Sequence, residues 1–107
     1  MSIPVEVADL GRTLQDFDAA YLLTTSSAGT VKVVSVLVDQ SLDSGSLLVP
    51  GPGRGSLANV GANPAVTLLF PPQAPGGMSL LVDGTGTGNG EDVEVVPTSA
   101  VLHKAAT

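Results

Sequence analysis

The sequence predicts a mainly β fold, arranged as a closed or half-closed barrel with two or three short helices. The first observation is spacing: roughly six β-rich runs follow one another about ten residues apart, with clusters of Gly, Pro, Asn, Asp and Ser between them. The second is that two runs, 31–39 and 65–70, are apolar on both faces, as expected of strands covered on both sides. The third is length, because 107 residues fit a single domain over 1–107.

The opening segment PVEVADLGRTLQDFD, residues 4–18, is predicted to form a short helix. Its apolar residues recur near one helical face, at Val5, Leu10, Leu14 and Phe17. Gly11 lies inside the segment and weakens that prediction, because glycine is a poor helix former.

The strands are predicted from short runs of β-branched and other apolar residues between turn signals. In chain order they cover residues 21–25, 31–39, 47–50, 65–70, 78–89 and 91–97. The glycine-rich stretch DGTGTGNG, residues 83–90, is interpreted as the end of a strand with a turn. The tail, residues 98–107, is expected to end in one helical turn.

The bulk composition predicts a homodimer and excludes several partners. Hydrophobic residues make up 43% and charged residues 13% of the chain, which is more apolar surface than a small monomer hides. The net charge of −6 argues against nucleic acid and anionic membranes, because neutralising phosphates needs clustered Lys and Arg. There is no cysteine for disulfides or thiolate metal sites, and no signal peptide is evident at the start. We therefore expect a cytoplasmic protein.

Catalytic side chains are scarce. His103 is the single histidine, and capping or packing of a C-terminal turn is the expected role for it. The carboxylates come in loop pairs, Asp39 with Asp43 and Glu91 with Asp92, and are interpreted as solvated surface groups. No metal site is predicted. If this chain carries out a reaction, we expect a bound cofactor to supply the chemistry.

One loop, GPGRGSLANVG at residues 51–61, has features of an anion site. Its glycines let the backbone approach a ligand closely, and Ser56 is placed to cap a helix over residues 57–60. The free amides of that helix attract anions, and Arg54 adds a guanidinium that can contact a phosphate. The stretch matches neither the dinucleotide fingerprint nor the nucleotide P-loop. By composition alone, a plain mobile loop and an anion site both stay open.

The order of these features resembles that of the pyridoxamine 5′-phosphate oxidase-like family, the flavin-binding split barrels. The resemblance covers residues 14–104, and its most specific parts are GRGSLANVGANPAVTLLF and SLLVDGTG. It implies a six-stranded split β-barrel with short helices, and a homodimer with two FMN sites at the interface.

The resemblance also implies which residues hold the cofactor. FMN would lie along the early strands, with its ring against the backbone around Thr24, Thr25 and 33–36. Its phosphate would be held by side chains around the second strand and the turn before the Asn-containing helix. The matching positions in this sequence are Lys32, Val33, Val34, Ser35, Pro50, Arg54, Ser56 and Asn59.

The sequence departs from the family pattern at Ala58. Flavin-binding members usually carry Lys or Arg there, just before the Asn, so Arg54 is left as the one clear cationic partner of a phosphate. The alternating pattern of a strand puts Lys32 on the face of Val34 and Val36. The basic residues that would hold a phosphorylated second substrate are not visible, so oxidation of pyridoxine phosphate is not predicted.

Three functions stay open at this point. The first is a flavin- or deazaflavin-dependent oxidoreductase of unknown substrate. The second is a non-catalytic dimeric module that binds a small ligand or a flavin, which the scarcity of catalytic side chains favours. The third is a structural dimer with a degenerate pocket.

Overall fold

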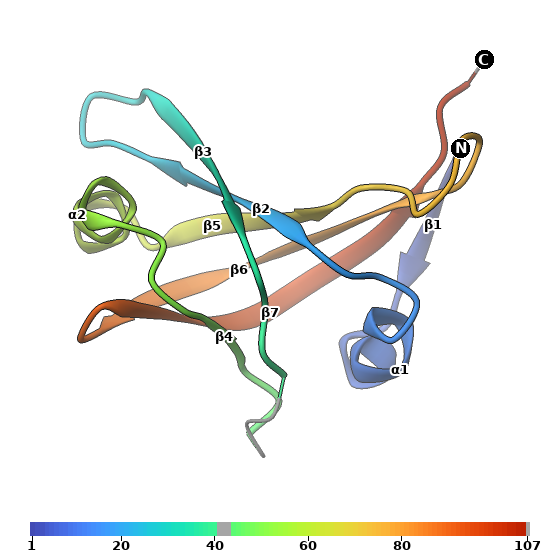
Figure 1. Ribbon diagram of the computed structural model, residues 1–107, viewed down its shortest axis with the longest axis horizontal. Helices are drawn as coiled ribbons and strands as arrows, with labels where there is room; N and C mark the ends of the chain where they lie inside the picture. The colour runs from blue at the N-terminus through green and yellow to red at the C-terminus, as the bar shows by residue number, and fades with distance from the viewer. Residues whose placement is uncertain (41–43, 107) are drawn as a thin grey trace.

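A computed structural model describes residues 1–40 and 44–106 of the chain (Figure 1). Its strands belong to one antiparallel sheet, in the order β1-β7-β6-β5-β2-β3, with β4 paired to β7. The elements are β1 (Ser2–Val5), a 3₁₀ turn η1 (Val7–Asp9), α1 (Leu10–Leu14), β2 (Ala20–Thr25), β3 (Val31–Val36), β4 (Leu47–Val49), α2 (Arg54–Ala62), β5 (Ala65–Phe70), β6 (Ser79–Asn89) and β7 (Asp92–His103).

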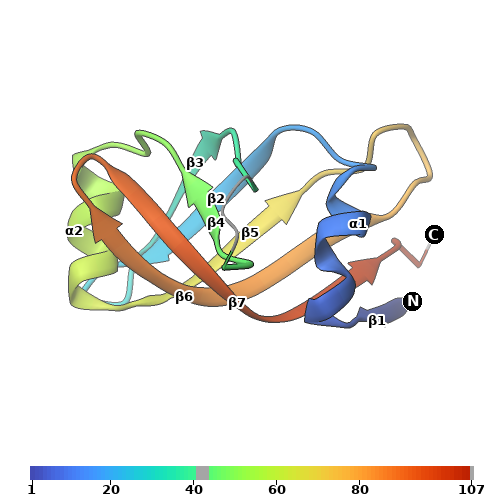
Figure 2. The same cartoon turned by 90° about the horizontal axis from the view of Figure 1, so that it is seen from below.

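The sheet curls into a barrel, which is closed through the short strand β4. β4 pairs with the first part of β7, from Leu47 opposite Val95 to Val49 opposite Val93. Beyond the end of β3, Asp39 and Leu48 exchange two backbone hydrogen bonds of 2.8 Å, and this single bridge joins β3 to β4. The predicted split barrel is therefore confirmed, although the described residues form seven strands instead of the six expected. Its helices lie at opposite ends, α2 at one and α1 with both termini at the other (Figures 1 and 2).

The core fills the inside of the barrel. Inward residues alternate with outward ones along the strands, as the buried positions of β6 show, starting at Leu80 and Val82. The largest fully buried side chains are Leu22, Leu68, Leu80, Val49, Val82, Val93, Val95, Thr24 and Ser56. At the α1 end, Phe17 and Phe70 meet edge to face, with ring centroids 6.1 Å apart.

The glycine-rich end of β6 makes room for α2. Gly86 faces inward, where an added methyl group would lie 3.1 Å from the Val66 side chain and 3.3 Å from that of Val60 on α2. Two residues along, a methyl group on Gly88 would come 3.8 Å from Leu57 of the same helix. The expected strand end with a turn is correct, and its alternating glycines let the helix pack close to the barrel.

Two predicted elements are wrong. Part of the predicted opening helix is strand β1, because Ser2–Val5 pair with the last residues of β7; only 7–14 are helical, as η1 and α1. The tail is not a helical turn, because it continues β7 as far as His103. Both errors arise from the long-range pairing of β1 with β7. This pairing makes strands of residues whose local pattern favours a helix. Among the described residues no helix is long and apolar enough to cross a bilayer.

Candidate functional site

The site begins at the first turn of α2, where the backbone turns sharply into the helix. Gly53 precedes the helix with a φ of 99°, a conformation that favours glycine. Its carbonyl accepts the amide of Leu57 at 3.1 Å, so the amides of residues 54–56 precede the first intrahelical bond. Asp92 fixes the approach to this turn, because its carboxylate accepts the amide of Gly51 at 3.0 Å. The turn presents free amides and the positive end of the helix dipole.

Lys32 brings a cation to this turn from strand β3. It pairs with Thr24 across β2 and β3 and lies on the same face as the buried Val36, as the alternating pattern predicts. Its side chain crosses directly over Gly55. A methyl group added to Gly55 would lie 2.9 Å from Lys32 Cε and 3.2 Å from Nζ. Only glycine at position 55 lets the lysine lie against the helix start.

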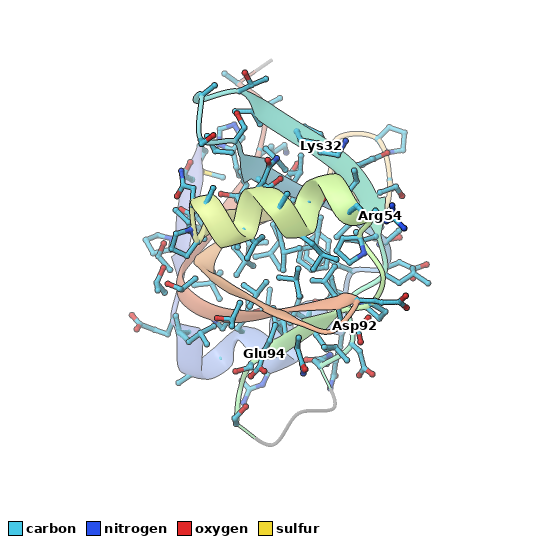
Figure 3. The ribbon with its side chains drawn as sticks, turned by 90° about the vertical axis from the view of Figure 1, so that its left-hand side faces the viewer. Lys32, Arg54, Asp92 and Glu94 are labelled. Atoms are coloured by element: carbon cyan, nitrogen blue, oxygen red, sulfur yellow. The ribbon has the colours of Figure 1, made fainter. Side chains whose placement is uncertain are left out.

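Arg54 is the second cation at the same place. It is the first residue of α2, it is exposed, and Figure 3 shows it at the same end of the helix as Lys32. With Leu57 and Glu91 it lines a hollow of about 240 Å³. Within residues 1–40 and 44–106, neither Lys32 nor Arg54 forms an ion pair. Both charges are therefore available to an anion.

Ser56 does not cap the helix as predicted. Gly53 occupies the capping position, and Ser56 is the third helical residue. Its side chain is fully buried, and its hydroxyl has no hydrogen-bond partner among the described residues. The hydroxyl faces the barrel interior, while the Ser56 amide belongs to the free first turn. The role of its side chain in binding a cofactor stays a prediction.

Asn59 ties α2 to the barrel wall. Its amide nitrogen donates to Thr24 Oγ1 at 3.1 Å, and Thr24 is almost completely buried. Because Thr24 of β2 pairs with Lys32, this bond holds the helix beside β2, next to the strand that carries the lysine. The structure thus gives Asn59 a positioning role, and its contact with a cofactor stays a prediction.

The remaining predicted positions are split between two faces. Val34 is half-buried on the inner face with Lys32, whereas Val33 and Ser35 are exposed on the outer face of β3. Pro50 is exposed directly after β4. The structure therefore brings Lys32 and Arg54 together at the start of α2, and places Val33 and Ser35 on the opposite side of their strand.

The other candidate groups lie apart from this turn. His103 is in β7, paired with β1, where its Nδ1 is 2.9 Å from Ser2 Oγ; it does not cap a helical turn. Asp39 belongs to the bridge that joins β3 to β4, and Asp43 lies outside the described residues. No group of three or more metal-ligating side chains occurs in the part of the chain that the structure describes.

Sequence reasoning missed the role of Gly55 and the surroundings of Asp83. The packing of Lys32 over Gly55 joins two segments that are far apart in the chain, and neither residue alone signals it. Asp83 lies inside the predicted strand 78–89, but the strand prediction does not include the bulge between Asp83 and Gly84 in β6. A glycine inside a strand pattern is a recognised sign of a bulge, so this feature had a signal.

Comparison with solved structures defines the class of the protein by its fold. A candidate pyridoxamine 5′-phosphate oxidase from Listeria innocua aligns with a TM-score of 0.72 at 15% identity, over 92% of this chain and 98% of that one. An FAD-binding protein from Mesorhizobium loti aligns with a TM-score of 0.68 at 15% identity, over 95% and 96%. An F420 reductase aligns with a TM-score of 0.65 at 19% identity, over 83% and 94%. The fold is that of the pyridoxamine 5′-phosphate oxidase-like split barrels.

Sequence comparison then places the chain among its relatives. It is 34% identical over 119 aligned positions to the uncharacterized protein Mb0449c of Mycobacterium bovis, covering 95% of this chain and 82% of that one. The same values hold for the uncharacterized protein MT0457 of Mycobacterium tuberculosis. No family model matches the chain. The chain belongs to the family of these mycobacterial proteins, and its own fold is the pyridoxamine 5′-phosphate oxidase-like split barrel.

Proposed function

We propose that this chain binds a phosphate-bearing flavin, FMN, or a deazaflavin, and that it acts as an oxidoreductase. Its fold is shared with an FAD-binding protein and an F420 reductase, which supports a flavin or deazaflavin as the ligand. The observation that carries the proposal is the meeting of Lys32 and Arg54 at the first turn of α2, where free amides also point outward.

The residues of this turn fit a phosphate. A dianion needs donors and positive charge, and the turn offers two cations together with the amides of residues 54–56. Ala58 does not provide the basic group usual at its position, but Lys32 supplies a second cation from β3. The phosphate would thus be held by Arg54 from the helix and by Lys32 from the strand. The ring would rest along the β3 backbone, at the weakly joined edge between β3 and β4.

The chain's own residues would bind and orient the cofactor. Asn59 and Thr24 hold α2 against the barrel, and Asp92 fixes the loop that enters the helix. A bound flavin or deazaflavin would supply hydride transfer, which the side chains of this site do not. The protein's part would be to position the cofactor and to exclude water from it.

We further propose that the chain works as a homodimer. The outer face of the β2–β3 hairpin and its continuation carry exposed apolar side chains: Tyr21, Val31, Val33 and Leu37, of which Val33 is 55% and Leu37 is 68% exposed. Such a patch on a small protein is typical of an interface. Sedimentation analysis should give twice the chain mass for the wild type and the monomer mass for Val33→Asp. The cytoplasmic location stays a prediction.

A second candidate is a dimer that holds a flavin without turnover. The position of His103 favours it, because the single histidine lies on β7 where β1 pairs, while α2 covers the other end of the barrel (Figures 1 and 2). No described histidine is therefore available to the α2 turn as a proton donor or acceptor. This candidate shares the binding site with the first and differs only in the reaction.

The test is a titration of the purified protein with FMN and, separately, with a deazaflavin, in which binding is monitored by visible absorbance. Saturable changes with either compound support the proposal, and no change with both contradicts it. Oxidation of the bound reduced cofactor by a second substrate, beyond the rate of free cofactor, then separates the oxidoreductase from the non-catalytic module.

A further inference from the structure

A second hollow lies on the outer face of the sheet, opposite the side on which Lys32 packs. It measures about 550 Å³ and extends across strands β3, β2, β5, β6 and β7. One side is lined by apolar groups such as Leu23, Val31 and Val66, and the other by Asp83 and threonine hydroxyls. A ligand bound here would meet an apolar wall and a polar wall at once.

A β-bulge builds the polar wall. Asp83 pairs with Ser99 and Gly84 with Pro97, so Thr98 has no opposite residue. The hydroxyl of Thr98 donates to the Asp83 carbonyl at 3.1 Å. A side chain at position 84 would be blocked, because an added methyl group would lie 2.6 Å from the carbonyl oxygen of Val96. The bulge is therefore fixed by the backbone.

The carboxylate of Asp83 is held in place from the neighbouring strand. Thr67 on β5 donates its hydroxyl to Asp83 Oδ1 at 2.6 Å. No other side-chain partner of Asp83 occurs among the described residues, so Oδ2 is open to a donor in the hollow. A carboxylate oriented in this way by the protein loses little freedom when it binds a ligand.

The charge of the hollow selects against anions. Asp83 is the one charged side chain among its lining residues, and Arg12, Lys32, Arg54 and Lys104 are all absent from that lining. The net charge of −6 adds a negative field around it. An ammonium group would meet a carboxylate and hydroxyl oxygens, which accept hydrogen bonds from it.

We infer that this hollow binds the protonated amino group of a small organic ligand, with the apolar body of that ligand against Leu23 and Ala65. Asp83 would accept from the ammonium group, while Thr67 and Thr98 keep the carboxylate and its backbone in position. The inference does not rest on the proposed cofactor, because Asp83, Thr67 and Thr98 are not among the residues predicted to hold it.

The test uses benzylamine as the probe, with benzyl alcohol and benzoate as isosteric comparisons. Amide ¹H–¹⁵N spectra of the full chain without any flavin should show shifts at 67, 83 and 98 on titration with benzylamine. Binding should be weaker for benzyl alcohol and undetectable for benzoate. Asp83→Asn, which keeps the acceptor for Thr67, should lower benzylamine affinity about tenfold or more. Asp16→Asn, an equal change of charge at another exposed position, should leave the affinity unchanged.

A second variant keeps the test decisive if Asp83→Asn does not fold. Thr85→Lys places a cation in the hollow, and it should abolish benzylamine binding and allow benzoate to bind. The inference is overturned if wild-type protein does not bind benzylamine, if benzoate binds as well as benzylamine, or if folded Asp83→Asn binds benzylamine with unchanged affinity. A failure of flavin binding would leave these outcomes intact, so the two proposals are tested separately.

Discussion

The start of α2 and the bulge at Asp83 are both built around a glycine that leaves no room for a side chain, yet they differ in what occupies the space. At Gly55, an added methyl group would come 2.9 Å from the flexible end of Lys32. At Gly84, it would come 2.6 Å from the backbone oxygen of Val96. The first neighbour can move and the second cannot.

This difference separates a binding element from a structural one. Lys32 can shift toward a ligand at little cost, because only side-chain rotamers change. The Gly84 bulge fixes two strands, and the orientation of Asp83 follows from it. The two sites also have opposite charge, cationic at α2 and anionic on the outer face, so they select ligands of opposite sign.

The largest effect is expected from removing the cations at α2. Arg54→Ala and Lys32→Ala should each weaken FMN binding by about 1.5–3 kcal/mol, or roughly tenfold to a hundredfold, because each deletes a charge-assisted contact. The free energy of unfolding should change little, since both side chains are exposed. Fluorescence titration and thermal unfolding measure the two quantities. Lys104→Ala is the matched control, and an equal loss of affinity there would point to net charge instead of a site.

Breaking the bulge should have the next largest effect. Gly84→Ala is expected to lower the free energy of unfolding by about 1–3 kcal/mol, because backbone atoms must shift to admit the methyl group. Chemical denaturation measures this change. Gly61→Ala, in α2 with nothing within 4 Å of the added methyl group, should instead stabilise the protein by about 0.5–1 kcal/mol. Equal stability of Gly84→Ala and wild type would show that the bulge is adaptable.

A smaller effect is expected from changing Gly55, at the start of α2. Gly55→Ala displaces the end of Lys32 and should lower FMN affinity by less than Lys32→Ala does. Stability should stay within about 0.5 kcal/mol of wild type, because the lysine moves and alanine favours the helix. A large loss of stability would contradict the distinction between the two glycines.

Much of the barrel could be predicted because its strands carry local signals. The runs at 65–70 and 78–89 are apolar and bounded by turn residues, and they match β5 and the whole of β6. The strand β1 could not be predicted in the same way. Residues 2–5 are strand because they pair with 100–103, nearly a whole chain length away, and that pairing has no local signal.

The candidate site was predicted in composition but not in geometry. Arg54 was expected in the loop just before a helix capped by Ser56, and it is instead the first residue of that helix. The alternating pattern gave the correct face for Lys32. The helix begins two residues before Ser56, because Gly53 directly before it adopts a positive φ. The loop holds several glycines, and the sequence does not indicate which of them adopts that conformation. That Lys32 meets Gly55 depends on how α2 lies across the barrel, and that arrangement is set by tertiary contacts such as Asn59 with Thr24.

The central claim is that the first turn of α2 binds the phosphate of a flavin, and the most direct measurement compares FMN with riboflavin, which lacks the phosphate. Wild-type protein should bind FMN at least tenfold more tightly than riboflavin, and Lys32→Ala/Arg54→Ala should remove that preference while leaving riboflavin affinity unchanged. Equal affinity of wild-type protein for the two compounds, or a preference for FMN that survives in the double variant, would contradict the claim.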